Sequence, residues 1–459
     1  MEEGRETIRI INKYILKDPL SKEELETILR DESFQKPLFF QENKFLHDKF
    51  SLFLKNNDHI LRINNALHIY KNGIYEPNHL DIENAMIKHI PTLKANQRLE
   101  VLKYLEISIR ENTKVDSANL IAFENGVYNI DTEEFSHFSP ENIITNKIPW
   151  KYNPKAYSEA ADTVLNRLSC NDKKIRSLLE EAIGYCFYRR NELGIAFILT
   201  GDKANGKSTF LSMAQNLLGE RNVASLDIHE LTDRFKKAEL YGKLANIGDD
   251  IGEEFISDAS TFRKLVTGDS VTVERKGHDP FAFNPYAKFL FSANVIPRIK
   301  DKTGAIKRRL CIIPFKASFT KLLPDGTPNP NFDPYIKYAL KGEDVMEYLI
   351  NLGLAGLKRI LQNKEFTFSE KVKKELDAYE ETNNPILGFF KECEVEEFQI
   401  ENEPTNVVYK RYQEYCLANS LQAMSNIEFS KQVNRILKLK TVLKRVNGKR
   451  YRIFISENQ

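Results

Sequence analysis

Gly201-Asp202-Lys203-Ala204-Asn205-Gly206-Lys207-Ser208-Thr209 fits the phosphate-binding pattern G-x-x-x-x-G-K-[ST], and its surroundings agree with it. The run 195–200 before it is short and apolar, which is typical of a buried parallel strand. The stretch 208–218 after it has apolar residues at helical spacing and ends at Gly219. Strand, glycine-rich loop and helix in this order predict backbone N–H groups that surround a β-phosphate at a helix N-terminus. The sequence therefore predicts a nucleoside triphosphatase.

Two side chains of this loop have defined expected roles. Lys207 would neutralise β- and γ-phosphate oxygens, and the Ser208 hydroxyl would bind Mg²⁺. All nine residues of the loop are expected to contact the nucleotide. ATP is favoured over GTP because the sequence contains no N-K-x-D guanine signature. A chance glycine-rich turn is the structural alternative to this interpretation.

Bulk composition is that of an ordinary soluble globular chain. Its 459 residues suggest about three domains; 41% are apolar, 29% are charged, and the net charge is only +2. Any nucleic-acid contact must therefore come from local basic patches. The N-terminus lacks a secretory apolar region and no run approaches the ~20 residues of a membrane helix, so we expect a protein of the bacterial host cytosol with no membrane partner.

The five cysteines are scattered and form no C-x-x-C pair. This pattern favours a reducing compartment and argues against a zinc site or a disulfide framework. The residues are Cys170, Cys186, Cys311, Cys393 and Cys416.

Changes of pattern along the chain divide it into four expected parts. Two hairpin signals, at Asn72-Gly73 and Asn125-Gly126, indicate a mixed α+β domain at the front. The expected parts are an N-terminal α+β domain (1–154), a helical collar or oligomerisation segment (155–192), an ATPase domain (193–384) and a winged-helix-like domain (385–459).

The ATPase part alternates strand-like and helical runs, which predicts a parallel α/β sheet of the phosphate-loop, AAA+-like type. The expected strands lie at 193–200, 222–226, 244–248, 287–293 and 310–315.

A hydrophobic strand ends in the acid pair Asp249-Asp250. One carboxylate at such a position can hold Mg²⁺, and a second can orient or deprotonate the attacking water. We assign Asp249 to the metal and Asp250 to the water, with Glu253 and Glu254 as reserve candidates for the base. The alternative is a solvent-facing acidic pair at a strand end.

Two further polar groups follow in the same region. Asn294 ends another buried-strand pattern and could bond the γ-phosphate or its attacking water, although asparagine is also a common turn residue. Lys307-Arg308-Arg309 precedes the last strand, where Arg309, or alternatively Arg308, suits an arginine finger that reaches the γ-phosphate of a neighbouring subunit. A solvated basic turn is the alternative.

Two basic hairpins are candidate nucleic-acid contacts. The run 271–283 places Arg275, Lys276 and His278 around a glycine tip between alternating strands. In isolation this pattern is an ordinary surface hairpin. Residues 407–459 contain 11 lysines and arginines against 3 glutamates, a net charge of +8, in the order helix, helix, basic hairpin. The winged-helix pattern puts Lys444, Arg445, Lys449 and Arg450 near the tip.

The spacing of these motifs is compact, with 42 residues from Lys207 to Asp249 and 45 from Asp249 to Asn294. Taken together, they resemble the superfamily 3 helicases, AAA+-related hexameric DNA helicases of small viruses, phages and mobile elements. The poxvirus-type and phage/plasmid primase–helicase branch is the most similar. Its N-terminal helicase-associated region resembles 120–154 here, and the resemblance extends over about 45–459.

The resemblance implies residue roles by position. Motif A falls on Gly201, Gly206, Lys207 and Ser208, and motif B on Asp249 and Asp250. The motif peculiar to the superfamily resembles 268–276, with Lys276 as the DNA-contacting lysine; motif C maps to Asn294, and the arginine finger to Arg309 or Arg308. Many relatives carry a primase domain ahead of the helicase, whereas no acidic polymerase motif is evident before residue 195, so we expect a helicase without the primase domain.

These observations predict an ATP- and Mg²⁺-dependent, ring-forming hexameric helicase acting on single-stranded and duplex DNA in replication of a phage, plasmid or genomic island. The superfamily implies 3′→5′ travel, and a replication initiator or primase is an expected partner. One alternative is an AAA+ origin-binding initiator that remodels DNA without processive unwinding. A second is a monomeric small-molecule kinase, which would leave both basic hairpins unexplained.

Overall fold

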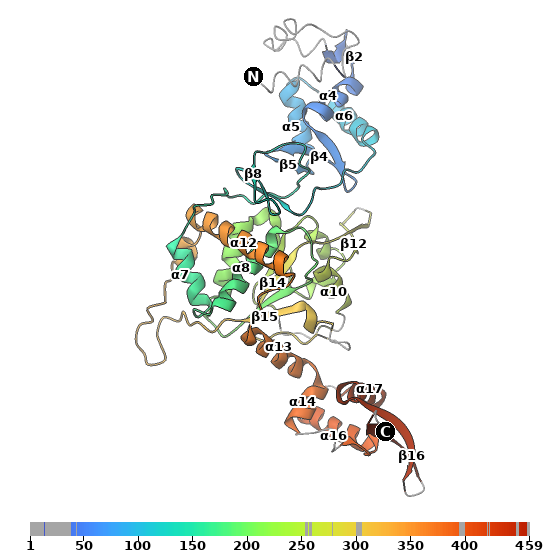
Figure 1. Cartoon of the computed structure of the whole chain (residues 1–459). Helices are drawn as coiled ribbons and strands as arrows, with labels where there is room; N and C mark the ends of the chain where they lie inside the picture. The colour runs from blue at the N-terminus through green and yellow to red at the C-terminus, as the bar shows by residue number, and fades with distance from the viewer. Residues whose placement is uncertain are drawn as a thin grey trace. The chain divides into compact units, whose positions relative to one another are not determined.

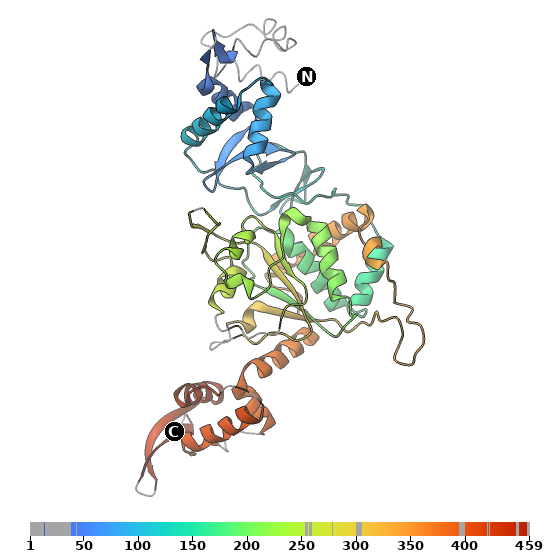
Figure 2. The same ribbon diagram turned by 180° about the vertical axis from the view of Figure 1, so that it is seen from behind.

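The computed structural model describes residue 13 and residues 38–456, apart from 43, 253–255, 257–258, 278, 300–304, 394–399, 420, 422 and 447–448. The chain divides into two compact units, Met1–Ala156 and Tyr157–Gln459. Of the helices in this described part, none is both long and apolar enough to cross a membrane. Figures 1 and 2 show the elements from opposite sides.

The first unit combines helices with short antiparallel sheets, as its hairpin signals predict. Its apolar core is centred on buried side chains of α4 and α6, such as Phe50, Leu54 and Leu105. The helices are α4 (His47–Asn57), α5 (His79–His89) and α6 (Ala95–Ser108). The strands are β1 (Phe40–Gln41), β2 (Lys44–Phe45), β3 (Ile60–Ile63), β4 (Ala66–Lys71), β5 (Ile74–Glu76), β6 (Leu120–Phe123), β7 (Gly126–Asn129) and β8 (Phe135–Ser136).

Both predicted Asn-Gly hairpins form, but the second turns one residue earlier than expected. Asn72 and Gly73 join β4 to β5 with positive φ values of 50° and 90°. In the second hairpin Gly126 already pairs with Phe123 as the first residue of β7. Close packing requires a glycine at position 126, because a Cβ there would lie 2.4 Å from the Ser136 carbonyl oxygen of β8.

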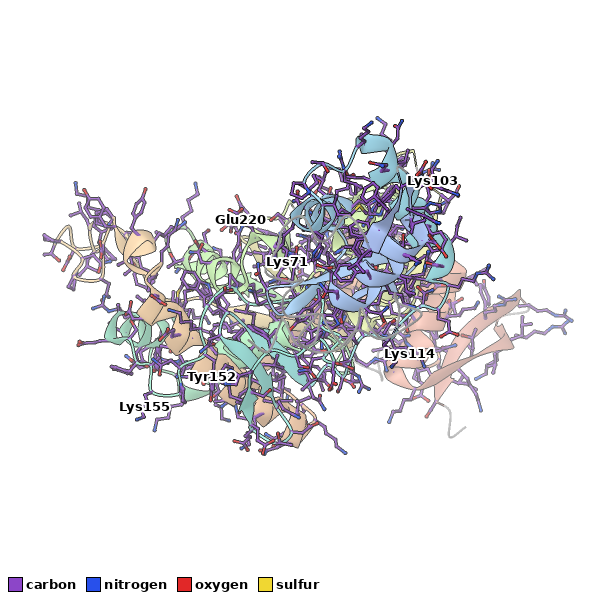
Figure 3. All side chains as sticks on the ribbon, turned by 90° about the horizontal axis from the view of Figure 1, so that it is seen from above. Lys71, Lys103, Lys114, Tyr152, Lys155 and Glu220 are labelled. Atoms are coloured by element: carbon purple, nitrogen blue, oxygen red, sulfur yellow. The ribbon has the colours of Figure 1, made fainter. Side chains whose placement is uncertain are left out.

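The side chain of Tyr152, labelled in Figure 3, packs against the sheet formed by β6, β7 and β8. Its ring packs within 5.9 Å of Phe123 and 5.1 Å of both Tyr128 and Phe135, measured between ring centroids. Asn125 fixes the same segment through hydrogen bonds with the Tyr152 backbone.

The second unit is built on a five-stranded parallel sheet, and all five strands predicted for the ATPase part are present. The strands are β9 (Ala196–Thr200), β10 (Val223–Ala224), β11 (Ala245–Gly248), β14 (Lys288–Ala293) and β15 (Leu310–Pro314), in the order β10-β11-β14-β9-β15. Every residue of β14 is buried. The order inserts β14 between the loop strand β9 and the acid strand β11, so the ends of all three meet at one edge.

Helices flank this sheet (Figures 1 and 2). Helix α8 packs on α12 at very close range, because a Cβ at Gly184 would lie 2.0 Å from the Gly353 carbonyl oxygen. The helices are α7 (Glu159–Leu168), α8 (Lys173–Phe187), α9 (Lys207–Leu218), α10 (Ser260–Thr267), α11 (Ile336–Ala339) and α12 (Glu343–Asn363). A separate hairpin pairs β12 (Val271–Val273) with β13 (Phe281–Phe283).

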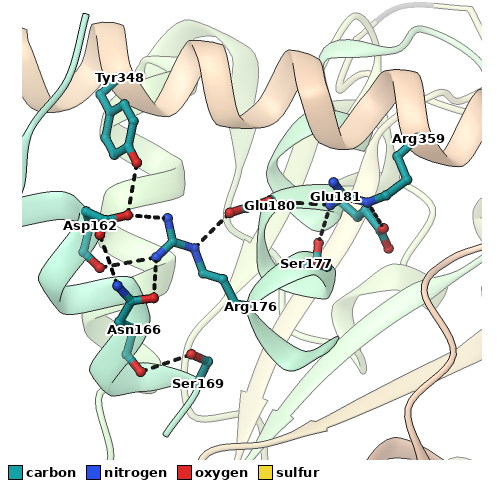
Figure 4. A network of polar contacts seen from close by, with 9 residues as sticks. All are labelled: Asp162, Asn166, Ser169, Arg176, Ser177, Glu180, Glu181, Tyr348 and Arg359. Atoms are coloured by element: carbon teal, nitrogen blue, oxygen red, sulfur yellow. Dashed lines mark hydrogen bonds and ion pairs between the residues drawn. The ribbon is translucent and has the colours of Figure 1, made fainter. Parts of the chain in front are cut away.

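A polar network ties α7, α8 and α12 together (Figure 4). The Arg176 guanidinium donates to Asp162, Asn166 and Glu180, each at 2.8 Å. The Tyr348 hydroxyl of α12 donates to Asp162 at 2.9 Å. These bonds lower the pKa of Asp162 against the opposing effect of its burial. Sequence patterning predicts these helices but not this network.

A lysine is fully buried at the start of β14. The Lys288 ammonium donates to the Tyr188 carbonyl at 2.6 Å, just beyond the end of α8, and to the Tyr286 carbonyl at 2.5 Å. It also lies 4.5 Å from the centroid of the Tyr185 ring. Burial lowers the pKa of Lys288 to about 7. The same desolvation raises the pKa of the buried Cys186 and Cys311 thiols to about 12.

Within its described residues, the end of the chain has three helices and a long hairpin, which follow the charged helix α13 (Glu370–Asn383). Phe389, Tyr412 and Phe429 form the centre of its core. The elements are α14 (Pro385–Glu392), α16 (Thr405–Ala418), α17 (Asn426–Leu437), β16 (Leu439–Val446) and β17 (Lys449–Ser456). Asn447-Gly448, the predicted turn, lies outside the described residues. The winged-helix assignment and the four domain boundaries stay predictions.

Candidate functional site

The glycine-rich loop joins β9 to α9, as predicted. Gly206 precedes the helix with a positive φ of 88°, and a Cβ there would lie 2.3 Å from Leu168 Cδ2. Gly201 has φ 150°, and a Cβ there would lie 2.2 Å from the Phe315 carbonyl oxygen. Both positions therefore need glycine, which lets the backbone fold tightly ahead of the helix N-terminus.

Lys207 lies in the first turn of α9 and is only 8% exposed. Its ammonium donates to the Gly201 carbonyl at 2.5 Å, the Asp202 carbonyl at 2.9 Å and Asn294 Oδ1 at 3.1 Å. The lysine therefore bridges the loop and the end of β14, two segments 87 residues apart.

The acid pair follows β11 at the same edge. The Ser208 hydroxyl donates to Asp249 Oδ1 at 3.0 Å, so the two expected magnesium ligands are adjacent. Asp250 has a positive φ of 57° and accepts a 3.3 Å hydrogen bond from Asn294 Nδ2. The structure thus brings Lys207, Ser208, Asp249, Asp250 and Asn294 together.

Ser292 is a site residue that motif reasoning missed. Its hydroxyl donates to Asp249 Oδ1 and accepts from the Asp250 backbone N–H at 2.8 Å, so it orients both acids from β14. Its side chain is almost completely buried, at 1% exposure. A polar residue inside the apolar run 287–293 is the signal that could have identified it.

These residues fit a magnesium–nucleotide complex. The two tight glycines shape a cradle of backbone N–H groups at a helix N-terminus, where a phosphate is stabilised. A hydroxyl beside a carboxylate is the oxygen donor set that Mg²⁺ accepts. Asn205 Oδ1 is buried in the loop and has no hydrogen-bond partner among the described residues. Ser208 and Asp249 would hold the metal.

The two finger candidates differ in their surroundings. Both belong to the short 3-10 turn Lys307–Arg309 ahead of β15. Arg308 is exposed, whereas Arg309 is half-buried and donates to the Ala305 carbonyl at 2.7 Å. Lys307 is bound to Asp377 at 2.9 Å and to Glu380, both on α13. The finger role of Arg309 or Arg308 stays a prediction.

The predicted basic hairpin pairs β12 with β13 in register Val271–Phe283 to Val273–Phe281. Lys276 is exposed after β12. The Arg275 guanidinium lies 5.5 Å from the Tyr241 ring centroid and 5.3 Å from that of Phe281. His278, like the reserve bases Glu253 and Glu254, lies outside the described residues.

The C-terminal cations sit on the β16–β17 hairpin. Arg445 pairs directly with Arg450, and Lys444 with Tyr451. Arg445, Lys444 and Arg450 are exposed. Lys449 begins β17 opposite Val446. Like charges directly opposite each other are unfavourable in a sheet, so this tip is suited to an anionic ligand.

Known family profiles match successive parts of the chain. The profile described as "D5 N terminal like" matches residues 24–184, and the one described as "Poxvirus D5 protein-like" matches 381–458. Between them, a family of unknown function, DUF5906, matches residues 199–309, the stretch that holds the loop, the acids and Asn294.

Viral relatives carrying the name "Putative helicase" are similar to long parts of the chain. The protein of Acanthamoeba polyphaga mimivirus is 28% identical over 46% of this chain and 24% of its own length. That of invertebrate iridescent virus 6 is 24% identical over 72% of this chain and 37% of its own length. The Sputnik virophage protein is 22% identical over 75% of this chain and 46% of its own length. The chain therefore spans less than half of these relatives.

Solved structures of the NrS-1 C-terminal region share the fold. One has a TM-score of 0.51 at 13% identity and covers 86% of this chain and 95% of its own. Fold and site together define a phosphate-loop-like protein with a parallel-sheet core. The D5-type profiles at both ends and the viral relatives support a D5-like member of the superfamily 3 primase–helicases.

Proposed function

We propose that the chain is an ATP-dependent DNA helicase that works as a hexameric ring. The convergence of Lys207, Ser208, Asp249, Asp250 and Asn294 at one sheet edge carries this proposal, because it supplies the groups that hydrolysis of a nucleoside triphosphate needs. The helicase-like names of the viral relatives support the use of that hydrolysis on DNA.

In the proposed reaction, Ser208 and Asp249 would hold a Mg²⁺ ion, which would supply positive charge next to the β- and γ-phosphates. Lys207 holds γ-phosphate oxygens, and Asp250 orients the attacking water and accepts its proton. The carboxamide of Asn294 bonds to both Lys207 and Asp250, so a change in either reaches strand β14 directly. These bonds support a role for Asn294 as the group that would report the presence of the γ-phosphate to the sheet.

In the ring, Arg309 or Arg308 of one subunit would approach the γ-phosphate bound by the next subunit. Exposure of Arg308 favours it as the reaching side chain, whereas Arg309 would have to leave the Ala305 carbonyl. A planar guanidinium there would neutralise transition-state charge.

The 271–283 hairpin is the proposed DNA contact that moves with hydrolysis. Lys276 is exposed at its tip, and the rings of Tyr241 and Phe281 hold the neighbouring Arg275. The C-terminal hairpin would add a separate grip on duplex phosphates during loading. The proposed setting is replication of a phage, plasmid or other mobile element, with 3′→5′ travel.

Unwinding of a forked duplex by Lys207→Ala and Lys276→Ala variants tests the proposal. We expect Lys207→Ala to lose ATP hydrolysis, and Lys276→Ala to keep hydrolysis while losing strand separation. Lys103→Ala, on the exposed face of α6, is the matched control and should leave both activities intact. Normal unwinding by Lys276→Ala would refute the hairpin mechanism. DNA-stimulated hydrolysis without strand separation by the unmodified chain would instead identify an origin-binding initiator.

A further inference from the structure

A cavity of about 490 Å³ lies beside the glycine-rich loop. Its walls come from the C-terminal part of α7 with the turn that follows it, and from the segment 317–319 after β15. Both belong to the second unit, and both contact the loop directly.

The wall segment 317–319 is bonded to the loop along its length. The Phe319 N–H donates to the Ala204 carbonyl at 2.9 Å, and Asn205 donates its side-chain amide to the Ala317 carbonyl. A Cβ at Gly206 would lie 3.1 Å from the Phe319 ring. The half-buried Phe319 ring therefore lines the cavity where the loop enters α9.

The opposite wall carries polar groups whose orientation is fixed. Asn166 lines the cavity while its amide donates to Asp162 at 3.0 Å and its carbonyl accepts from Arg176 at 2.8 Å (Figure 4). Arg167 lines the cavity beside it and is exposed. An aromatic ring in the same lining as a fixed amide and a guanidinium suits a planar heterocycle with polar edges.

A second cavity, of about 420 Å³, has a different character. Ser208 and Asp249 line it together with Asp227, Glu230 and a single lysine, Lys337, and its lining contains no aromatic ring. This acidic cavity suits the metal side of a nucleotide rather than its base. The two cavities therefore divide the loop's surroundings into a metal side and an aromatic side.

We propose that the cavity lined by Phe319 and Asn166 receives the nucleoside end of the nucleotide, with the base stacked on the Phe319 ring. The inference rests on the proposed nucleotide site, because it needs the phosphates on the loop. Arg176 is then a positioning residue, since it holds Asn166 in place. This assigns base recognition to helix α7 and the segment after β15.

Calorimetric titration of the full chain, with Mg²⁺ present, separates the nucleoside from the phosphates when ATP is compared with inorganic tripolyphosphate. Phe319→Leu keeps an apolar side chain against Gly206 but removes the ring. We expect it to weaken ATP binding about tenfold and to leave tripolyphosphate binding unchanged. Phe319→Tyr, which keeps the ring, should bind ATP within about twofold of the unmodified chain. Tyr338→Leu, an exposed ring in α11, is the matched control.

Equal loss of both ligands in Phe319→Leu would overturn the inference, because the side chain would then only shape the loop. Unchanged ATP binding in Phe319→Leu would overturn it as well. Failure of the unmodified chain to bind either ligand would refute the nucleotide site itself, and with it the proposed function. Tripolyphosphate binding without any gain from the nucleoside would leave the loop intact as a phosphate site and refute the base subsite alone.

Discussion

The glycine-rich loop and the C-terminal hairpin both present cations suited to phosphate, but they hold them in opposite ways. Lys207 is 8% exposed and each of its three hydrogen bonds ends on an oxygen fixed by the loop or by β14. Arg445 and Arg450 face each other across β16 and β17, and both are exposed. The fold fixes the position of the Lys207 ammonium, whereas it only displays the Arg445 and Arg450 guanidiniums on the surface.

This difference predicts two kinds of phosphate binding. A buried ammonium held in one geometry acts on a particular oxygen and is screened little by salt. Exposed guanidiniums act through counterion release, so their contribution falls steeply as salt rises. The loop should therefore control chemistry, and the hairpin should control only the strength of DNA binding.

Lys207→Ala should produce the largest effect. We expect ATP hydrolysis to fall about 10²- to 10³-fold, because the preorganised charge at the γ-phosphate is lost. A coupled steady-state ATPase assay measures it, with Lys103→Ala as the control for loss of one positive charge. Hydrolysis at the normal rate would show that the buried Lys207 has no catalytic role, and that it does not differ in this respect from the exposed arginines of the hairpin.

Asp249→Asn and Asp250→Asn should separate metal binding from water activation. We expect both to lower hydrolysis about 100-fold. Only Asp249→Asn should also raise the Mg²⁺ concentration needed for nucleotide binding, since Asp249 lies against Ser208. Asparagine tolerates the positive φ of Asp250, so the second variant keeps the backbone unstrained. Mg²⁺ titrations of nucleotide binding measure the split, and identical Mg²⁺ dependence would contradict the assigned roles.

Local patterns predict the strands, the loop and the polar groups that follow them. Glycine spacing marks the loop, and apolar runs mark β9, β11 and β14 because parallel strands are buried on both faces. Asp249 and Asn294 are recognisable because each ends such a run. Their meeting at one edge follows from the parallel arrangement. This much of the site needs no knowledge of tertiary contacts.

The remaining contacts depend on which strands become neighbours. Ser292 reaches Asp249 only because β14 pairs with β11, and Lys207 reaches Asn294 because β14 also pairs with β9. The Asn166–Arg176 bond depends in the same way on how α7 packs against α8. Turn chemistry can also mislead, as at Gly126, where close packing against β8 rather than the turn requires the glycine.

The effect of burial on a cation can also be measured at Lys288, which begins β14, at the other end of the strand from Asn294. Burial lowers its pKa from 10.5 to about 7, so between these values the unfolded chain binds a proton that the folded chain does not. The unfolding free energy should therefore rise with pH above about 7, by about 1.4 kcal/mol per unit from this group, and be flat below.

Lys288→Met should remove that dependence. Relative to the unmodified chain, the variant's advantage in unfolding free energy should be greatest at pH 6–7 and shrink towards pH 9. Urea denaturation followed by circular dichroism from pH 6 to 9 measures it, with Lys103→Met as the exposed control. Parallel pH profiles for Lys288→Met and the unmodified chain would show that enclosure by two carbonyls and the Tyr185 ring does not perturb this cation.

The smallest effects should come from the C-terminal hairpin, and they should have opposite signs for binding and stability. We expect Arg445→Ala/Arg450→Ala to weaken duplex binding about tenfold and to reduce the slope of log K against log salt by about 2, because two phosphate contacts are lost. Lys103→Ala/Lys114→Ala removes the same charge from exposed positions in the first unit and should leave the slope unchanged (Figure 3).

The single change Arg450→Ala should stabilise the hairpin by about 0.2–1 kcal/mol, since it removes the repulsion from Arg445 across the strands. Hydrogen exchange of the β16 and β17 amides measures this in the same chain. A gain in hairpin stability with a loss in DNA affinity is the outcome expected of a surface retained for a ligand. If Arg450→Ala lowered both the stability of the hairpin and its affinity for DNA, the arginine pair would be stabilising the hairpin. The proposed difference between this hairpin and the glycine-rich loop would then be wrong.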